Sequence, residues 1–387
     1  MPLLLLVFFI ADLLSIAYPF IAFYLWREWN RFNNTINDAY ADRCLYGTIA
    51  LLAFIFLGRY LVKFIISKKR KEEDDPQMLQ SSKREFVKRT DGTLINIEHY
   101  GKQDGQPIIL VHGLNANSKN WFYQLKHFEK NYRIITMDLA GLGKSTRPSN
   151  KDFSLTKMAY DLNSVIQHTG VKNPILWGHS MGGMTILTLV AKHKQVLPTK
   201  VSGVILQHTT YTNPVKTIML RRLMTAIQKP VLIPLCWILI FLSPVVWIIR
   251  WMSYINGNSH IVSRWLTFTG TQSSKQLDFT TLLSTLAPPA VTGRACLGMF
   301  QYDVTQQLCN IDIPALVIAA SKDRLTRPDA SEYMSKEIPN AQLVMLSPAN
   351  HQGLIERNQE VNKAAEKFIG SITETNKVRN IQNKSTK

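Results

Sequence analysis

The sequence predicts an α/β fold with a mainly parallel sheet wrapped by helices, together with an apolar insertion and apolar amino-terminal helices. Short runs rich in β-branched residues alternate with amphipathic stretches such as 155–168 and 181–193. That alternation is typical of a parallel sheet with helical crossovers. The expected strands cover residues 93–99, 107–111, 132–137, 174–177, 201–206, 314–319 and 341–346.

The first apolar segment, residues 2–25, predicts a membrane-spanning helix. A helix of that length covers a hydrocarbon core of about 30 Å, and Trp26 and Trp29 follow at the position of an interfacial belt. A cleaved signal peptide is the alternative, but the segment lacks a basic start and a small-residue cleavage site. Asp12 is costly at depth, so we expect it near one end or facing a partner helix.

A second apolar segment, residues 45–66, contains Arg59 and Lys63 one helical turn apart. It crosses a membrane if both side chains extend to the headgroups, and otherwise it lies in the interface. If both segments cross, the basic cluster Lys68–Lys71 predicts a cytoplasmic position for the following domain. We therefore expect residues 1–70 to be an integral membrane anchor of one or two transmembrane helices.

The composition of the chain and its pattern of segments predict the remaining domain boundaries. Residues 71–88 are charged and aperiodic, which is typical of a linker. We expect the α/β core in 89–208 and 300–370, with a lid or cap insertion in 209–299 between them. Residues 371–387 are polar and basic, and they are expected to form a disordered tail.

The segment Gly178–Gly182 follows a buried strand and opens a helix, which places Ser180 on a sharp turn with its hydroxyl exposed. Such a hydroxyl becomes a nucleophile only when a base removes its proton. His351 lies in the loop after the last strand, at the carboxyl edge of the sheet where ligands bind in open α/β folds. Five other histidines are not expected to act as the base. The His179 side chain leaves the serine turn in another direction, and His112 begins a different loop. The remaining three lie on helices: His127, His168 and His193.

Asp323 emerges from the strand 314–319 at the same edge, so the chain order is serine, aspartate, histidine. A turn or helix-cap aspartate is the alternative for this residue taken alone. Together the three residues predict a catalytic triad of Ser180, Asp323 and His351. The backbone amides of Met181 and Leu114 are the expected oxyanion-hole donors, and removing one such donor costs roughly 100-fold in turnover.

Five segments together resemble the α/β-hydrolase superfamily between about residues 88 and 370. They are Val111–Gly113, Asp138–Ser145, Gly178–Gly183, Ser321–Pro328 and Ala349–Gly353. The resemblance implies an α/β-hydrolase fold, the same triad and oxyanion hole, and a structural role for Asp138. Family members that act as dehalogenases or epoxide hydrolases carry Asp where Ser180 stands. A subgroup of acyltransferases carries His-x-x-x-x-Asp, whereas Glu356 follows His351 here.

About a hundred residues separate Leu206 from Pro314, far more than a crossover requires, so a lid is inserted there. Its stretch 231–249 is uncharged and contains Trp237 and Trp247. One simple crossing is excluded, because Ser180 and Asp323 lie on either side of it and must meet. We interpret this stretch as a membrane-dipping lid of short helices; the alternative is an apolar lid over a deep substrate pocket.

The net charge is +18, and the basic residues lie beside apolar stretches, which favours an anionic lipid surface over nucleic acid. The four cysteines show no metal-site spacing, and no cofactor or metal is expected. The leading hypothesis is a membrane-attached serine hydrolase, an esterase or lipase that cleaves a lipophilic ester such as an acylglycerol or lysophospholipid. An acyltransferase with the same triad and a non-catalytic membrane scaffold remain the alternatives.

Overall fold

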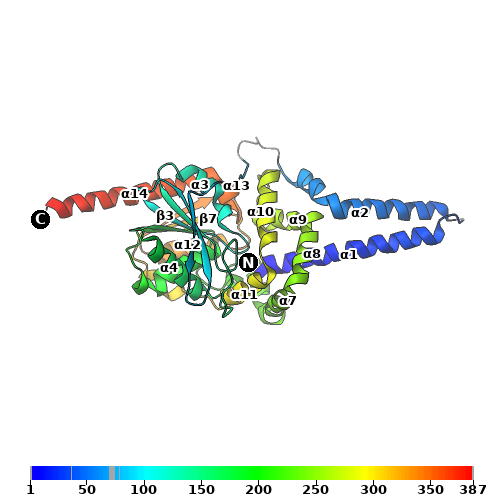
Figure 1. Ribbon diagram of the computed structural model, residues 1–387, viewed down its shortest axis with the longest axis horizontal. Helices are drawn as coiled ribbons and strands as arrows, with labels where there is room; N and C mark the ends of the chain where they lie inside the picture. Colours follow the sequence, from blue (N-terminus) through cyan, green and yellow to red (C-terminus); the bar gives the residue numbers. More distant parts are fainter. Residues whose placement is uncertain (1, 36, 69–74, 78, 386–387) are drawn as a thin grey trace.

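The computed structural model describes residues 2–35, 37–68, 75–77 and 79–385. Of the predicted basic cluster, Lys69, Arg70 and Lys71 lie outside the described residues. Along the long axis of the molecule, the sheet and its helices are followed by a helical cap and then by a projecting pair of helices (Figure 1).

An eight-stranded sheet forms the core, in the order β1-β2-β4-β3-β5-β6-β7-β8. β2 is antiparallel to its neighbours β1 and β4, and all other neighbouring strands are parallel. The strands are β1 Lys83–Lys88, β2 Leu94–Gly101, β3 Pro107–Val111, β4 Arg133–Met137, β5 Ile175–His179, β6 Gly203–Gln207, β7 Ala315–Ala320 and β8 Ala341–Leu346. The predicted α/β-hydrolase fold with a mainly parallel sheet is confirmed.

Helices cover both faces of this sheet. Ile109 and Val111 of β3 belong to one apolar core, and the alternating Ile108 and Leu110 belong to another. Because side chains alternate along a strand, a strand buried on both faces reads as one continuous apolar run. The first core includes α4 Leu155–Thr169, α5 Met181–Lys192 and α12 Pro328–Glu337, and the second includes α3 Phe122–Phe128, α13 Gly353–Glu356 and α14 Asn358–Ser385.

Two predicted boundaries differ from the structure. The expected linker 71–88 ends too late, because Lys83–Lys88 pairs with β2 as an edge strand in which only Val87 is buried. This strand is mostly exposed and rich in charged residues, so it lacks the apolar run by which the other strands are recognised. The expected disordered tail 371–387 is also wrong through Ser385, since α14 continues to that residue. No glycine or proline lies between 371 and 385 to end the helix.

The insertion folds into a cap of helices. It contains α6 Arg221–Ala226, α7 Ile233–Phe241, α8 Ser243–Ile255, α9 Asn258–Thr267, α10 Ser274–Leu286 and α11 Pro289–Phe300. Helices α7 and α8 meet at a bend of 98°, in agreement with the expected short helices. Pro234 and Pro244 lie in the first turns of these helices, where a missing N–H has no cost.

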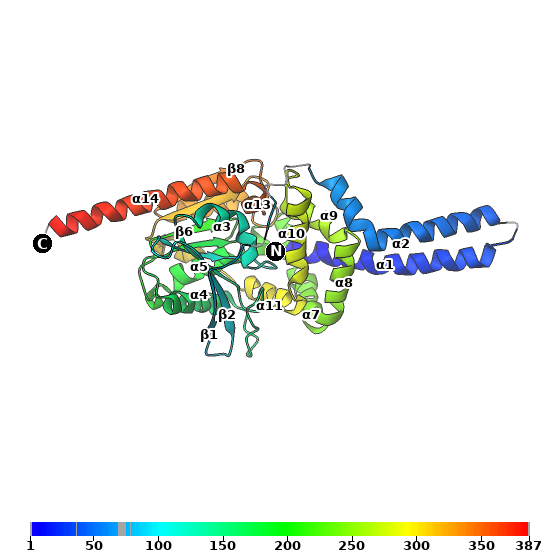
Figure 2. The ribbon, with the colours of Figure 1, turned by 45° about the horizontal axis from the view of Figure 1, so that its top comes forward.

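The amino-terminal part forms a helical hairpin of α1 Pro2–Phe32 and α2 Asp38–Ile66, which projects from the cap (Figure 2). Among the described residues these are two helices long and apolar enough to cross a membrane, or three spans if the bent pair α7–α8 counts as one. Lys63 lies 3.1 Å from Asp278 of α10, and the Arg59 guanidinium stacks on Tyr254 of α8. Both cations, whose extension to the headgroups was the condition for a crossing, thus contact the cap.

The contact between α2 and the cap yields a stability prediction. A Cβ atom at Gly58 would lie 2.3 Å from the backbone oxygen of Asn256, whereas one at Gly47 would meet only the Leu25 side chain at 3.2 Å. We expect Gly58→Ala to lower the free energy of unfolding by about 1–3 kcal/mol, because α2 must move away from the cap. Gly47→Ala, the control in the same helix, should be neutral or slightly stabilising. Thermal unfolding in detergent micelles measures both, and equal melting temperatures would contradict this packing.

Candidate active site

Ser180 lies on the turn between β5 and α5, with φ 53° and ψ −119°. Two glycines allow this turn. A Cβ at Gly182 would lie 2.0 Å from the Val111 oxygen, and one at Gly113 would lie 3.0 Å from the Ser180 Cβ. The close approach of β3 and its following loop to Ser180 and the start of α5 therefore requires glycine at both positions. It places the Ser180 side chain at the carboxyl edge of the sheet.

The structure brings Ser180, His351 and Asp323 together. His351 Nε2 lies 3.0 Å from Ser180 Oγ, and His351 Nδ1 lies 2.9 Å from Asp323 Oδ2. A carboxylate only accepts hydrogen bonds, so Nδ1 carries the ring proton and Nε2 accepts from the serine hydroxyl. All three side chains are buried. This arrangement can transfer the serine proton to the imidazole while the carboxylate stabilises the resulting charge.

Asp323 is held as a carboxylate by its neighbours. Oδ1 accepts from the backbone amides of Leu325 at 2.8 Å and Thr326 at 2.9 Å, and Oδ2 also accepts from the Thr326 hydroxyl at 2.9 Å. Burial raises the pKa of this carboxyl, but the His351 ring and the hydrogen bonds outweigh burial and hold the pKa at about 2. The group that orients His351 is therefore charged at neutral pH.

Two further histidines hold the loop that carries His351. The backbone oxygen of His351 accepts from His179 Nε2 and from His208 Nδ1, each at 3.0 Å. Burial lowers the pKa of His208 to about 4, and burial with the neighbouring imidazoles lowers the pKa of His179 well below its ordinary value. Both rings are neutral at pH 7, so each has one N–H to donate to this oxygen.

His208 is not among the residues predicted from the sequence, and the His179 side chain is predicted there to point away from the site. The position of His208 directly after β6 is the pattern that would have found it, because the carboxyl ends of neighbouring parallel strands share one edge. His179 faces the same loop since its ring lies 5.0 Å from that of His351. Neither ring contacts the serine hydroxyl through a hydrogen bond among those described.

The expected oxyanion-hole residues lie beside Ser180. Leu114 follows Gly113 in the loop after β3 and lines the cavity that contains Ser180 and His351. Met181 is the first residue of α5 and is fully buried. Leu114 thus lines the same cavity as Ser180 and Met181 follows Ser180 in the chain, and the donor roles of their amides stay a prediction.

Other polar residues near the site have structural partners. Asp138 accepts from the amides of Ser118 at 2.7 Å and Lys144 at 2.9 Å, which orders the loop after β4. The Glu356 carboxylate accepts from the amides and hydroxyls of Thr269 and Thr271. Glu356 therefore joins α13 to the segment after α9 and does not face Ser180.

The cap closes over the site. The cavity at Ser180 has a volume of about 40 Å³ and is lined by α1, α9, α10 and the loops at the sheet edge.

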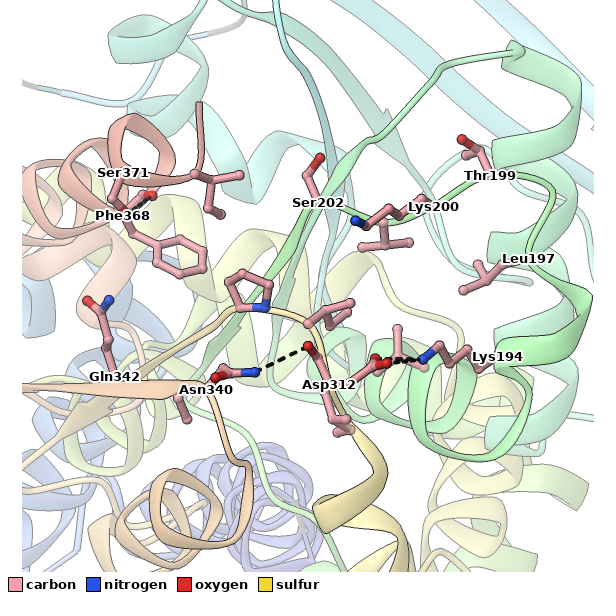
Figure 3. A pocket seen from close by; sticks show the side chains of 17 residues that line it. Lys194, Leu197, Thr199, Lys200, Ser202, Asp312, Asn340, Gln342, Phe368 and Ser371 are labelled. Atoms are coloured by element: carbon pink, nitrogen blue, oxygen red, sulfur yellow. Dashed lines mark hydrogen bonds and ion pairs between the residues drawn. The ribbon is translucent and has the colours of Figure 1, made fainter. Parts of the chain in front are cut away.

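A larger hollow of about 980 Å³ lies between the starts of β6 to β8 and α14, where Lys194 pairs with Asp312 (Figure 3). It opens at the opposite edge of the sheet, far from Ser180. Within the described ranges no group of His, Cys, Asp and Glu could hold a metal ion.

The alpha/beta hydrolase fold family matches residues 106–227 and 269–358, more than half of the chain. The chain belongs to this family. Lipase 3 of Moraxella sp. (strain TA144) is 23% identical over 269 residues, covering 65% of this chain and 73% of that protein. Lipase 1 of Psychrobacter immobilis is 22% identical over 277 residues, covering 67% and 75%.

The fold is also that of solved hydrolases. A thermophilic esterase from Thermogutta terrifontis superposes with a TM-score of 0.59 and 22% identity, covering 75% of this chain and 99% of that one. A similarity at this level of identity shows the fold. The family match and the lipase relatives place this chain among hydrolases of the esterase and lipase type.

The buried histidines yield a pH prediction. An unfolded His208 binds a proton below its ordinary pKa of 6.5, whereas the native side chain stays neutral down to about 4. The unfolded state binds more protons in this window, so stability falls as the pH is lowered from 6.5 toward 4. His208→Asn, whose amide can still donate at the position of Nδ1, should reduce this loss by up to about 1.4 kcal/mol per pH unit. Thermal unfolding from pH 7 to pH 4 measures it, and parallel curves for the two proteins would contradict the assignment.

Proposed function

We propose that this protein is a membrane-attached serine hydrolase that cleaves the carboxylic ester of a lipophilic substrate, such as an acylglycerol or lysophospholipid, through an acyl-enzyme. The observation that carries the proposal is the hydrogen-bonded series from Ser180 through His351 to Asp323, with distances of 3.0 and 2.9 Å. The lipase and esterase relatives support the reaction type.

In the proposed reaction, Ser180 Oγ attacks the ester carbonyl carbon while His351 Nε2 takes the hydroxyl proton. The carbonyl oxygen becomes an oxyanion, and the amides of Leu114 and Met181 are the proposed donors to it. Collapse of this intermediate breaks the bond to the alcohol oxygen, and His351 returns the proton to that oxygen. Water then repeats the sequence on the acyl-enzyme and releases the acid, and Asp323 stabilises the imidazolium in both halves.

The hairpin and the cap support attachment to a bilayer. Tyr18 donates to Asn258 of the cap, so only Pro19–Phe32 of α1 extends beyond this contact. At a rise of 1.5 Å per residue, this part is about 21 Å long, shorter than a hydrocarbon core of about 30 Å. The hairpin reaches across such a core only if part of the cap is also immersed in it.

The cap has an apolar surface suited to that position. Around the bend between α7 and α8 several large apolar side chains are exposed, namely Trp237, Ile238, Phe241, Leu242, Val245 and Ile248. Helix α8 packs against α1 and α2 where the hairpin leaves the cap (Figure 2). Immersion of this surface supports a lipophilic substrate taken from the bilayer, and it fits the expected anionic lipid partner of a chain with a net charge of +18.

Replacement of the serine tests the proposal. Wild-type protein in mixed micelles should react with a fluorophosphonate probe and release carboxylic acid from a panel of acylglycerols, lysophospholipids and nitrophenyl esters. Ser180→Ala should abolish labelling and lower acid release by about 1,000-fold or more, because the triad acts as a unit.

Ser335→Ala, on α12 and remote from the site, is the matched serine control and should behave as wild type. If folded wild-type protein neither reacts with the probe nor cleaves any ester, the hydrolase proposal is wrong and the scaffold alternative is favoured. If labelling occurs and an added alcohol receives the acyl group in place of water, the protein is an acyltransferase.

A further inference from the structure

The first turns of α1 lie inside the protein. Leu3, Leu5 and Phe8 are between 4% and 7% exposed, and they belong to the same apolar core as the sheet and cap residues. Both views place this end of α1 between the cap helices and the sheet (Figures 1 and 2). These three side chains are therefore covered by protein and Leu4 is half-buried beside them, in contrast to the exposed apolar side chains further along the hairpin.

Polar contacts fix the helix just beyond these turns. Asn258 of α9 donates to the backbone oxygen of Ala11 at 3.3 Å and to the Ser15 hydroxyl at 3.0 Å. Tyr18 donates to the same Asn258 side chain at 3.3 Å. The side chains of Leu4 and Phe8 are held by apolar contacts alone, since they have no polar atoms.

Leu4 and Phe8 lie between two small cavities. The first, of about 40 Å³, contains Ser180 and His351. The second, of about 10 Å³, is lined by the apolar Leu5, Phe9 and Leu239 and by the polar or charged Asp12, Arg250 and Thr292. Leu4, Phe8, Asn115 and Ser284 line both cavities, so the two spaces lie on either side of the same side chains. Without Leu4 and Phe8 they would form one space leading away from Ser180.

The direction of this space identifies the part of the ester that it would hold. The alcohol oxygen must lie beside His351 to receive the proton. No residue of the His351 loop lines the second cavity. Asn115 lines both cavities, and it follows Leu114, the expected oxyanion donor. A chain that extends from the carbonyl carbon toward this cavity moves away from His351, which is the path of the acyl group.

The volume of the cavity at Ser180 limits the length of the acyl chain that can bind there. A space of about 40 Å³ holds on the order of one to three water molecules, which is too little for a long acyl chain. From the proposed ester hydrolysis at Ser180, we infer that Leu4 and Phe8 of α1 are specificity-determining residues that occupy the distal part of the acyl site. The wild-type side chains at these two positions limit the length of the acyl chain that the site accepts, and smaller side chains admit longer chains.

The test compares kcat/KM for a series of 4-nitrophenyl esters from butanoate to hexadecanoate, with the full-length protein in mixed micelles. Phe8→Ala and Leu4→Ala should raise the ratio of long-chain to short-chain kcat/KM by about tenfold or more, because one pocket contact of this size discriminates roughly 10- to 200-fold. Leu13→Ala is the matched control, since Leu13 lies on the same helix but is 49% exposed, and its ratio should equal that of wild type.

Leu4→Trp tests the opposite direction and should lower the same ratio, which keeps the inference testable if the alanine variants do not fold. If Ser180 reacts with a fluorophosphonate probe and esters are cleaved, but the chain-length profile is the same in wild type, Phe8→Ala and Leu4→Trp, this inference is wrong and the hydrolase proposal stands. If wild-type protein neither labels nor cleaves any ester, the proposed function fails, and the inference fails with it.

Discussion

The backbone conformation at Ser180 is the constraint on which the rest of the site depends. A positive φ at a residue with a side chain persists only where the surroundings fix it, and here β3 and α5 do so. The Gly182 Cα lies so near the Val111 oxygen that no Cβ fits. β3 and β5 must therefore be neighbours, and the loops that follow them are brought to the serine. The parallel topology then adds the loops after β7 and β8, which carry Asp323 and His351.

Buried polar contacts connect this sheet edge to the cap. Asn350 accepts from the His351 amide through its side-chain oxygen at 2.8 Å and donates to the Phe268 oxygen at 3.2 Å. Glu356 binds Thr269 and Thr271, as described above. Buried groups left without such partners would cost about 1–3 kcal/mol each. Movement of the cap segment after α9 would therefore disturb the loop that positions the imidazole.

Elements that are marked by a short, continuous run of residues could be predicted from the sequence. Seven strands could be predicted because each contains a short apolar or β-branched run. In most of them the run reflects burial on both faces, whereas Ala341–Leu346 is a largely exposed edge strand. Ser180, Asp323 and His351 could be brought to one edge because each follows such a run. The edge strand Lys83–Lys88 has no such run. The first turns of α1 were expected to be in lipid, since hydropathy does not distinguish a bilayer from an apolar protein interior. The ion pair of Lys63 with Asp278 could not be predicted, because the two residues are distant in sequence.

Helix α1 also imposes an order on assembly. Its Ala11 and Ser15 bind Asn258, which lies 247 and 243 residues further along the chain. At a synthesis rate of about 5–20 residues per second, the helix waits on the order of tens of seconds before its partner leaves the ribosome. Until the cap has been synthesised, the leucines of α1 need another apolar surrounding. Once the cap has folded, they move from that surrounding into the protein interior. One isolated acid, Asp12, and one serine, Ser15, within an otherwise apolar stretch leave the helix compatible with both surroundings in turn.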